Sequence, residues 1–104
     1  MNEKYIAERI TALRLKKNVS EYRMSLDLGH SNSYIRSITS GNALPSMAEF
    51  LYICDYFGIT PKEFFDEKLQ NPVEAERLSA LVKNLSDDDL SMLVRLAERL
   101  SGKS

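Results

Sequence analysis

The chain has 104 residues, of which 43% are hydrophobic, so it can form one buried core but is too short for two full domains. Its few prolines and glycines form no low-complexity run, which argues against a long linker. One cysteine (Cys54) and one histidine (His30) exclude an internal disulfide and a structural zinc site. We therefore expect no metal and no other cofactor.

The apolar segments are short. No run reaches the roughly 18 residues that a membrane-spanning helix needs, and the N-terminal sequence MNEKYIAERI lacks the layout of a signal peptide. We expect a cytoplasmic protein that does not enter a membrane.

The net charge of −1 conceals a gradient along the chain. Residues 1–47 sum to +3, residues 48–71 to −3 and residues 72–104 to −1. A basic first segment suits an anionic partner, although ordinary variation in surface charge produces the same pattern.

The spacing of apolar residues is helical throughout, which predicts an all-α fold. In the first helix, about residues 3–17, Ile6, Ile10 and Leu13 form one stripe. Ser20 is predicted to cap a second, short helix that ends at Gly29.

A third helix is predicted from a Ser31 cap to about Ser40, ending at Gly41. Its inward residues are Ile35 and Ile38. The outward positions are small and polar, and Arg36 carries the only charge: Asn32, Ser33, Arg36 and Ser37.

Two further helices follow. Ser46 and Glu49 have the spacing of a capping box for a fourth helix, with these residues expected inward: Met47, Phe50 or Leu51, Ile53, Cys54 and Phe57. Thr60, Pro61 and Glu63 start a fifth helix that carries Phe64 and Phe65. We interpret Cys54 as a buried, inert thiol, and Tyr52 and Tyr56 as packing beneath the tail helices.

The tail predicts two more helices. One starts at Asn71 and Pro72, and the other is capped by Ser86. We interpret the three aspartates in the first turn of the second as stabilising the positive end of the helix dipole rather than as metal ligands. The last helix has a broad apolar face, which indicates burial on two sides: Leu90, Met92, Leu93, Val94, Leu96, Ala97 and Leu100. We expect residues 70–104 to be an extension used for packing or dimerisation.

The run from Arg9 to Asp66 resembles the lambda-repressor-like, Cro-type helix-turn-helix family of bacterial and phage regulators, also called the xenobiotic-response-element family. The matching pieces are RITALR, NVS, Gly29 and Ser31 around the turn, YIRSITSGNALPS and MAEFLYICDYFGITPKEFF. The resemblance implies a five-helix DNA-binding domain in residues 1–69. It also implies a homodimeric transcriptional regulator of double-stranded DNA at an inverted repeat, with repression and control of its own gene as the expected mode.

The resemblance also implies which residues meet DNA. Base contacts are expected from the outward residues at the start of the third helix, namely Asn32, Ser33 and Ser37. Contacts to the DNA backbone are expected from a wider set that supplies affinity without sequence information: Lys16, Lys17, Glu21, Arg23, Tyr34, Arg36, Ser40, Asn42 and Ala43. His30 is interpreted as an ordinary turn residue.

Three positions depart from the family pattern. Glu21 replaces a frequent glutamine, Thr39 replaces a glutamate that usually pairs with Arg14, and Asn42 replaces a frequently basic residue. These departures leave open an alternative, a protein-interaction module that kept the scaffold and lost DNA binding. The residues form no recognisable catalytic arrangement and leave no room for a ligand-binding domain, so we expect neither an enzyme nor a small-molecule sensor.

Overall fold

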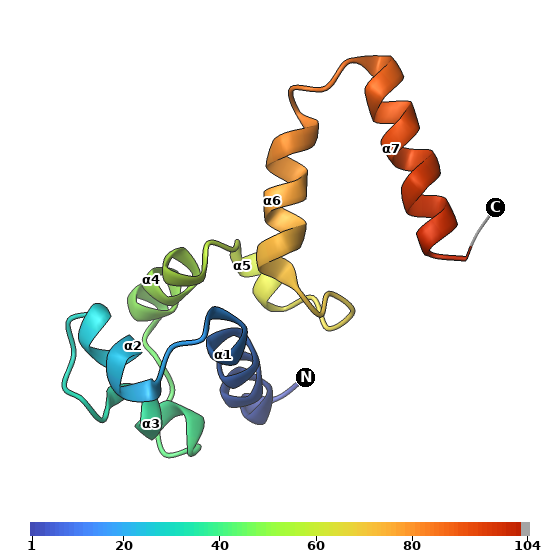
Figure 1. Cartoon of the computed structure of the whole chain (residues 1–104). Helices are drawn as coiled ribbons and strands as arrows, with labels where there is room; N and C mark the ends of the chain where they lie inside the picture. The colour runs from blue at the N-terminus through green and yellow to red at the C-terminus, as the bar shows by residue number, and fades with distance from the viewer. Residues whose placement is uncertain (103–104) are drawn as a thin grey trace. The chain divides into compact units, whose positions relative to one another are not determined.

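The computed structural model describes residues 1–102, and within that range every regular element is a helix. The helices are α1 (Glu3–Lys17), α2 (Glu21–Asp27), α3 (Tyr34–Thr39), α4 (Met47–Phe57), α5 (Pro61–Phe64), α6 (Pro72–Val82) and α7 (Asp87–Leu100) (Figure 1). The predicted all-α class is confirmed for these residues. None of the helices among them is long and apolar enough to cross a membrane.

The chain divides into two compact units, Met1–Val73 and the part from Glu74 onward. The division falls later than the predicted boundary after Leu69, because the first residues of α6 belong to the first unit. Pro72 is fully buried, and Val73 packs against the core of that unit.

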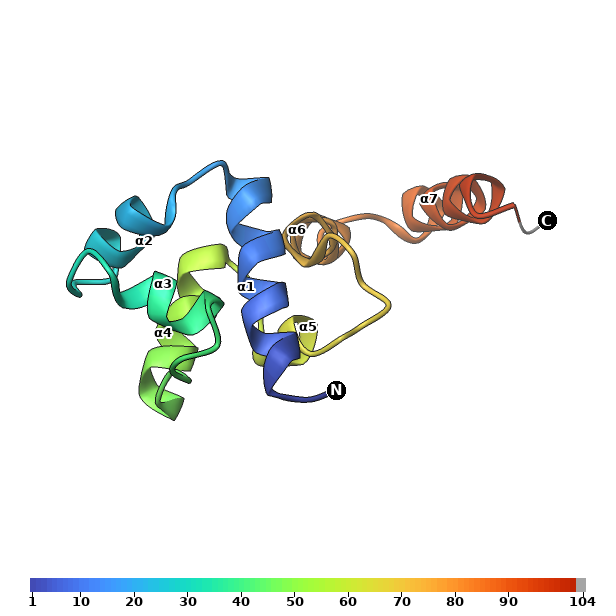
Figure 2. The same cartoon turned by 90° about the horizontal axis from the view of Figure 1, so that it is seen from below.

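The core of the first unit draws on all five of its helices and on the segment after α4. Its buried hydrophobic residues are Ile10, Leu13, Met24, Ile35, Ile38, Phe50, Ile53, Cys54, Phe57, Ile59 and Phe64. Figure 2 shows α1 to α5 gathered around this centre.

The inward face of α4 differs from the prediction at one position. Phe50 is buried and Leu51 is half-exposed, which resolves the alternative between them, but Met47 is 76% exposed. At about 100° per residue, Met47 lies roughly 70° from the middle of the buried face. It is also the first residue of α4, where side chains tilt toward the N-terminus and away from the turns that pack on the core. The prediction of an inward Met47 was wrong.

Several predicted caps are present. Ser20 accepts from the N–H of Arg23, and Ser86 accepts from the N–H of Asp89. Thr60 and Glu63 form a complete, reciprocal capping box. These ends are therefore determined by neighbouring residues in the chain.

A buried arginine joins the two ends of the first unit. Arg9 on α1 donates from Nε to the carbonyl of Phe64 (2.9 Å) and from Nη2 to that of Glu63 (2.8 Å). The Tyr5 hydroxyl also donates to the Phe64 carbonyl (2.8 Å). The carbonyl groups at the end of α5 thus find their partners on α1.

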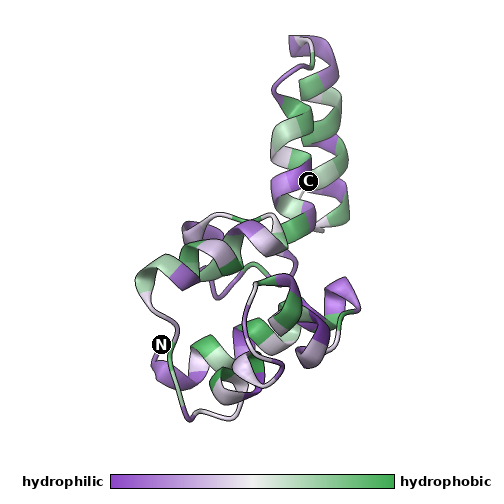
Figure 3. Ribbon diagram, turned by 90° about the vertical axis from the view of Figure 1, so that its left-hand side faces the viewer, coloured by the Kyte–Doolittle hydropathy of each residue, from purple (hydrophilic) through white to green (hydrophobic). Residues whose placement is uncertain are grey.

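The second unit has its apolar side chains exposed. In α7, residues Asp87–Leu100, no side chain is buried. Apolar and polar bands alternate along the helices of the tail in Figure 3. The large hydrophobic residues that are exposed there are Leu78, Leu81, Leu85, Leu90, Met92, Val94, Leu96 and Leu100.

Candidate nucleic-acid interface

A single buried serine joins α2 to α3. The Ser25 side chain on α2 is fully buried, and its hydroxyl donates to the carbonyl of Glu21 (2.7 Å) and accepts from the backbone N–H of Ile35 (3.0 Å). Because Ile35 is in the first turn of α3, this N–H has no partner within its own helix. Ser25 therefore acts as a cap supplied by the preceding helix, and it places the start of α3 against α2.

The predicted Ser31 cap was wrong. The helix begins at Tyr34, preceded by Ser33 in the capping position, whose side chain makes no capping hydrogen bond within the described residues. The Ser31 carbonyl accepts from the N–H of Tyr34 (3.1 Å), which makes this stretch a turn. The Tyr34 N–H, which a Ser31 side-chain cap would have satisfied, goes to the Ser31 carbonyl instead, and the Ile35 N–H goes to Ser25. The helix α3 is shorter than predicted, and Asn32 and Ser33 lie in the turn before it.

The outward side of this turn and of α3 is polar. Asn32, Ser33 and Arg36 are exposed and Ser37 is half-buried, whereas Ile35 and Ile38 are buried in the core. The Ser37 hydroxyl donates to the Ser33 carbonyl (3.2 Å), so its oxygen remains able to accept. The structure therefore brings the three expected base-contacting residues, Asn32, Ser33 and Ser37, together on one exposed surface.

The loop after α3 directs its amide groups inward. The N–H of Ser40 is donated to Arg36, and those of Asn42 and Ala43 are both donated to the Ser37 carbonyl at 3.0 Å. A phosphate would have to displace these bonds to use the amides. The side chains add little, because the Ser40 hydroxyl also donates to the Ser37 carbonyl (3.2 Å) and Ala43 has no polar side chain. The expected grip of Ser40, Asn42 and Ala43 on DNA is therefore weakened, with the Asn42 side-chain amide as the remaining donor.

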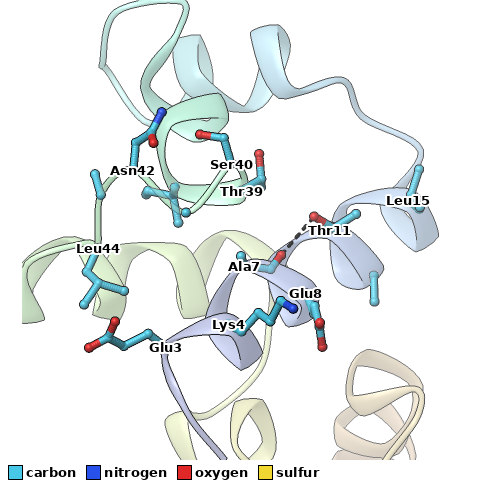
Figure 4. A pocket seen from close by; sticks show the side chains of 14 residues that line it. Glu3, Lys4, Ala7, Glu8, Thr11, Leu15, Thr39, Ser40, Asn42 and Leu44 are labelled. Carbon is cyan, nitrogen blue, oxygen red and sulfur yellow. Dashed lines mark hydrogen bonds between the residues drawn. The ribbon is translucent and has the colours of Figure 1, made fainter.

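A groove of about 930 Å³ separates this loop from α1. Figure 4 shows Thr39, Ser40 and Asn42 on one side and Glu3, Lys4 and Glu8 on the other. Two carboxylates and one ammonium group make the lining acidic, which disfavours an anion. The groove therefore does not supply the missing phosphate contacts.

The side chain of Glu21, the first residue of α2, is bonded to Thr39, the last residue of α3. The Thr39 hydroxyl donates to the Glu21 carboxylate, so two of the positions that depart from the family pattern bond to each other. Arg14, without the usual glutamate, donates from Nη1 to the carbonyl of Val19 (2.9 Å), while its buried Nε has no partner among the described residues. Glu21 adds negative charge at the expected contact surface, although its contact with Thr39 partly covers it.

Two of the expected phosphate-binding cations, Arg23 and Lys17, contact Asp27 and Tyr56 respectively. Arg23 forms an ion pair with Asp27 (3.0 Å), which also accepts from the Tyr56 hydroxyl (2.7 Å), and Lys17 lies 5.0 Å from the centre of the Tyr56 ring. Burial and the hydrogen bond to Asp27 raise the pKa of Tyr56 to about 12. Tyr56 is thus engaged with α1 and α2, whereas Tyr52 is 59% exposed.

His30 has a more specific role than the predicted turn residue. Its Nε2 lies 2.8 Å from a carboxylate oxygen of Glu49, and its ring stacks on Tyr34 with centres 3.8 Å apart and planes 9° from parallel. Glu49 is therefore turned away from Ser46, and only half of the predicted capping box forms, through the Glu49 N–H. Burial, followed by the nearby Glu49 carboxylate, raises the pKa of Tyr34.

Sequence reasoning missed Ser25 and the His30–Glu49 pair. A polar residue beside the apolar Met24 on the inward side of α2 was a usable signal for Ser25. Nothing in the local sequence connects His30 with Glu49, because the pair forms only when the turn packs on α4.

Comparison with known proteins gives no match: no family model matches the chain, and neither a curated protein nor a solved structure does so. Residues 1–102 also contain no group of three or more side chains placed to hold a metal ion.

Proposed function

We propose that residues 1–73 form a lambda-repressor-like helix-turn-helix domain that binds DNA, with α3 as the recognition helix. The observation that carries the proposal is the short polar surface at the start of α3. Buried Ile35 and Ile38 hold its inner side, and Ser25 secures its first turn from α2. Small hydrogen-bonding groups on a rigid helix tip suit the edges of bases in the major groove.

Each exposed polar group has a proposed role. Asn32 pairs with an adenine through its amide, and Ser33 and Ser37 bond to neighbouring bases. Arg36 and Lys16, both exposed, contact phosphate, and Lys17 and Arg23 add a more distant positive field. Because the loop amides are already bonded and Arg23 is paired, we expect fewer phosphate contacts and a shallower salt dependence than in strongly basic repressors.

The apolar faces of α6 and α7 support a homodimer. Eight large hydrophobic side chains of the tail are exposed, and burying such faces against a second copy would remove them from water. A two-fold arrangement would place two recognition helices about 34 Å apart on an inverted repeat. Such a protein would regulate transcription, with repression of its own gene as the expected mode.

Oligomeric state is testable in the full chain. We expect the variant carrying both Leu93→Glu and Leu100→Glu on the apolar face of α7 to sediment as a monomer. Ser91→Glu, on the polar side of the same helix, should remain dimeric. A double variant that sediments like the unaltered protein would contradict a dimer through α7.

DNA binding is tested with fragments from upstream of the protein's own gene. We expect a shifted band at low salt, and a dissociation constant raised about 5- to 150-fold in Asn32→Ala, which loses a bidentate base contact of about 1–3 kcal/mol. Gln70→Ala, which changes an exposed amide outside the proposed interface, is the matched control. Unchanged affinity and sequence preference in both Asn32→Ala and Ser33→Ala would show that these residues do not read bases.

A second candidate is a protein-interaction module on the same scaffold. The internally bonded loop amides and the acidic lining opposite them favour it, since both reduce affinity for phosphate. No shift with any upstream fragment at low salt, from protein that is folded and dimeric, would favour this candidate over DNA binding.

A further inference from the structure

We infer that His30 is a positioning residue for the proposed DNA-reading turn, and that its contact with Glu49 makes DNA binding depend on pH. The inference rests on the proposed function. It concerns three side chains from three segments: His30 in the turn, Tyr34 at the start of α3 and Glu49 on α4.

The His30–Tyr34 stack brackets the proposed base-contacting residues Asn32 and Ser33, which lie between the two rings in the chain. The centres of the two rings are 3.8 Å apart. With His30 joined to Glu49 at 2.8 Å, the start of the turn is tied to α4, and the stack ties its end to the same point. Neither Ser31 nor Ser33 caps α3, so this bracket adds to the two other side-chain restraints near Asn32 and Ser33, the Ser25 hydroxyl on the Ile35 N–H and the Ser37 hydroxyl on the Ser33 carbonyl.

The Tyr34 hydroxyl reinforces the restraint. Its oxygen is buried and has no hydrogen-bond partner among the described residues, so the tyrosine is held by packing and stacking. The His30 ring covers one face of Tyr34, which also packs against the core. Loss of the His30–Glu49 contact would therefore release His30 from α4 and loosen the start of the turn, while Tyr34 keeps its core packing.

Protonation of His30 changes the strength of the contact. A protonated imidazole adds a positive charge to the hydrogen bond with the Glu49 carboxylate and makes a cation–π contact with Tyr34, whereas the neutral ring donates to the same carboxylate without that charge. Binding should thus be tighter at pH 5.5 than at pH 7.5, because the lower pH favours the protonated ring.

Glu49 is the charged residue that pairs with His30. Tyr34 faces it from α3, and the charged groups of α2 are engaged elsewhere. Asp27 is bound to Arg23 and Tyr56, and Glu21 is bound to Thr39. His30 is also the only histidine in the chain.

The effect should be modest because the contact is partly exposed, with 30% of the His30 side chain and 27% of the Glu49 side chain accessible. Pairs of this kind change an equilibrium by about two- to fivefold. We expect the dissociation constant for operator DNA to rise by about that factor between pH 5.5 and pH 7.5 at constant salt.

The experiment compares the full-length protein with Glu49→Gln and His30→Gln, in two measurements over this pH range. One is DNA affinity, and the other is the amide chemical shifts of Asn32 and Ser33 by NMR without DNA. Glu49→Gln keeps the backbone N–H that Ser46 caps, and Asp55→Asn removes one exposed carboxylate from the same helix as the matched control. We expect His30→Gln to lose the pH dependence of affinity and of the two amide shifts, Glu49→Gln to lose most of it, and Asp55→Asn to keep it.

Two outcomes separate this inference from the proposed function. In a protein that binds no DNA, a pH dependence of the two amide shifts that Glu49→Gln reduces and Asp55→Asn keeps would support positioning while rejecting the DNA-binding role. Operator binding with the same pH profile in the unaltered protein and in Glu49→Gln would overturn the inference and leave the proposed function standing.

Discussion

The hydroxyl of Ser25 is the contact whose removal should reveal how α3 is held. Ser25→Ala deletes the acceptor for the Ile35 N–H and the donor to the Glu21 carbonyl while leaving the backbone of α2 unchanged. The site is fully buried, so water cannot replace the lost partner without opening the structure. The substitution therefore isolates the cap that α2 provides to α3.

The expected loss of stability follows from the Ile35 N–H, which Ser25→Ala leaves without an acceptor. A buried N–H left without a partner costs about 1–3 kcal/mol, and the better helix propensity of alanine in α2 returns about 0.5 kcal/mol. We expect the free energy of unfolding to fall by about 0.5–2.5 kcal/mol. With a urea m-value of about 1 kcal/mol/M, the midpoint should fall by about 0.5–2.5 M.

Urea titration by circular dichroism measures this loss, with hydrogen exchange at the Ile35 amide as a local readout. Ser37→Ala is the matched control, because its hydroxyl bonds only to the carbonyl one turn earlier in an exposed position. That control should change stability by less than about 0.5 kcal/mol. A Ser25→Ala protein as stable as the control, with unchanged exchange at Ile35, would refute the idea that Ser25 caps α3.

Three further predictions concern the first unit. Arg9→Met should lower the free energy of unfolding, measured by urea titration, by about 2–4 kcal/mol, because it leaves the carbonyl groups at the end of α5 without their donors. Lys4→Met, on the exposed side of α1, should change this free energy little. Burial raises the pKa of Cys54 from 9.0 to about 11, so at pH 8 the folded protein should react with iodoacetamide about 100-fold more slowly than the urea-unfolded chain; equal rates would contradict burial of the thiol. Spectrophotometric titration should find one tyrosine with a pKa of about 12 that disappears in Tyr56→Phe. Since that pKa is raised in the folded state, the stability it contributes should be fully present below pH 10 and be lost as the pH rises towards 12.

Local sequence rules determined much of the fold. Helical spacing of apolar residues gave the all-α class and most of the core, because one face of each helix must be removed from water. The caps at Ser20, Thr60 and Ser86 were also predictable, since donor and acceptor lie within one turn of each other. The polar outward residues of α3 followed from the same periodicity, which placed Ile35 and Ile38 inward.

Only the tertiary structure decided how that polar surface is held. The start of α3 is set by Ser25, on another helix, and this removed the need for the predicted Ser31 cap. His30 and Glu49 meet because the turn packs on α4, and the loop amides turn inward to the Ser37 carbonyl. Each of these contacts joins groups whose separation depends on chain folding rather than on helical pitch. The sequence by itself therefore determined which residues face outward, and the packing of α2, α3 and α4 determined where Asn32 and Ser33 lie and which donors remain for a partner.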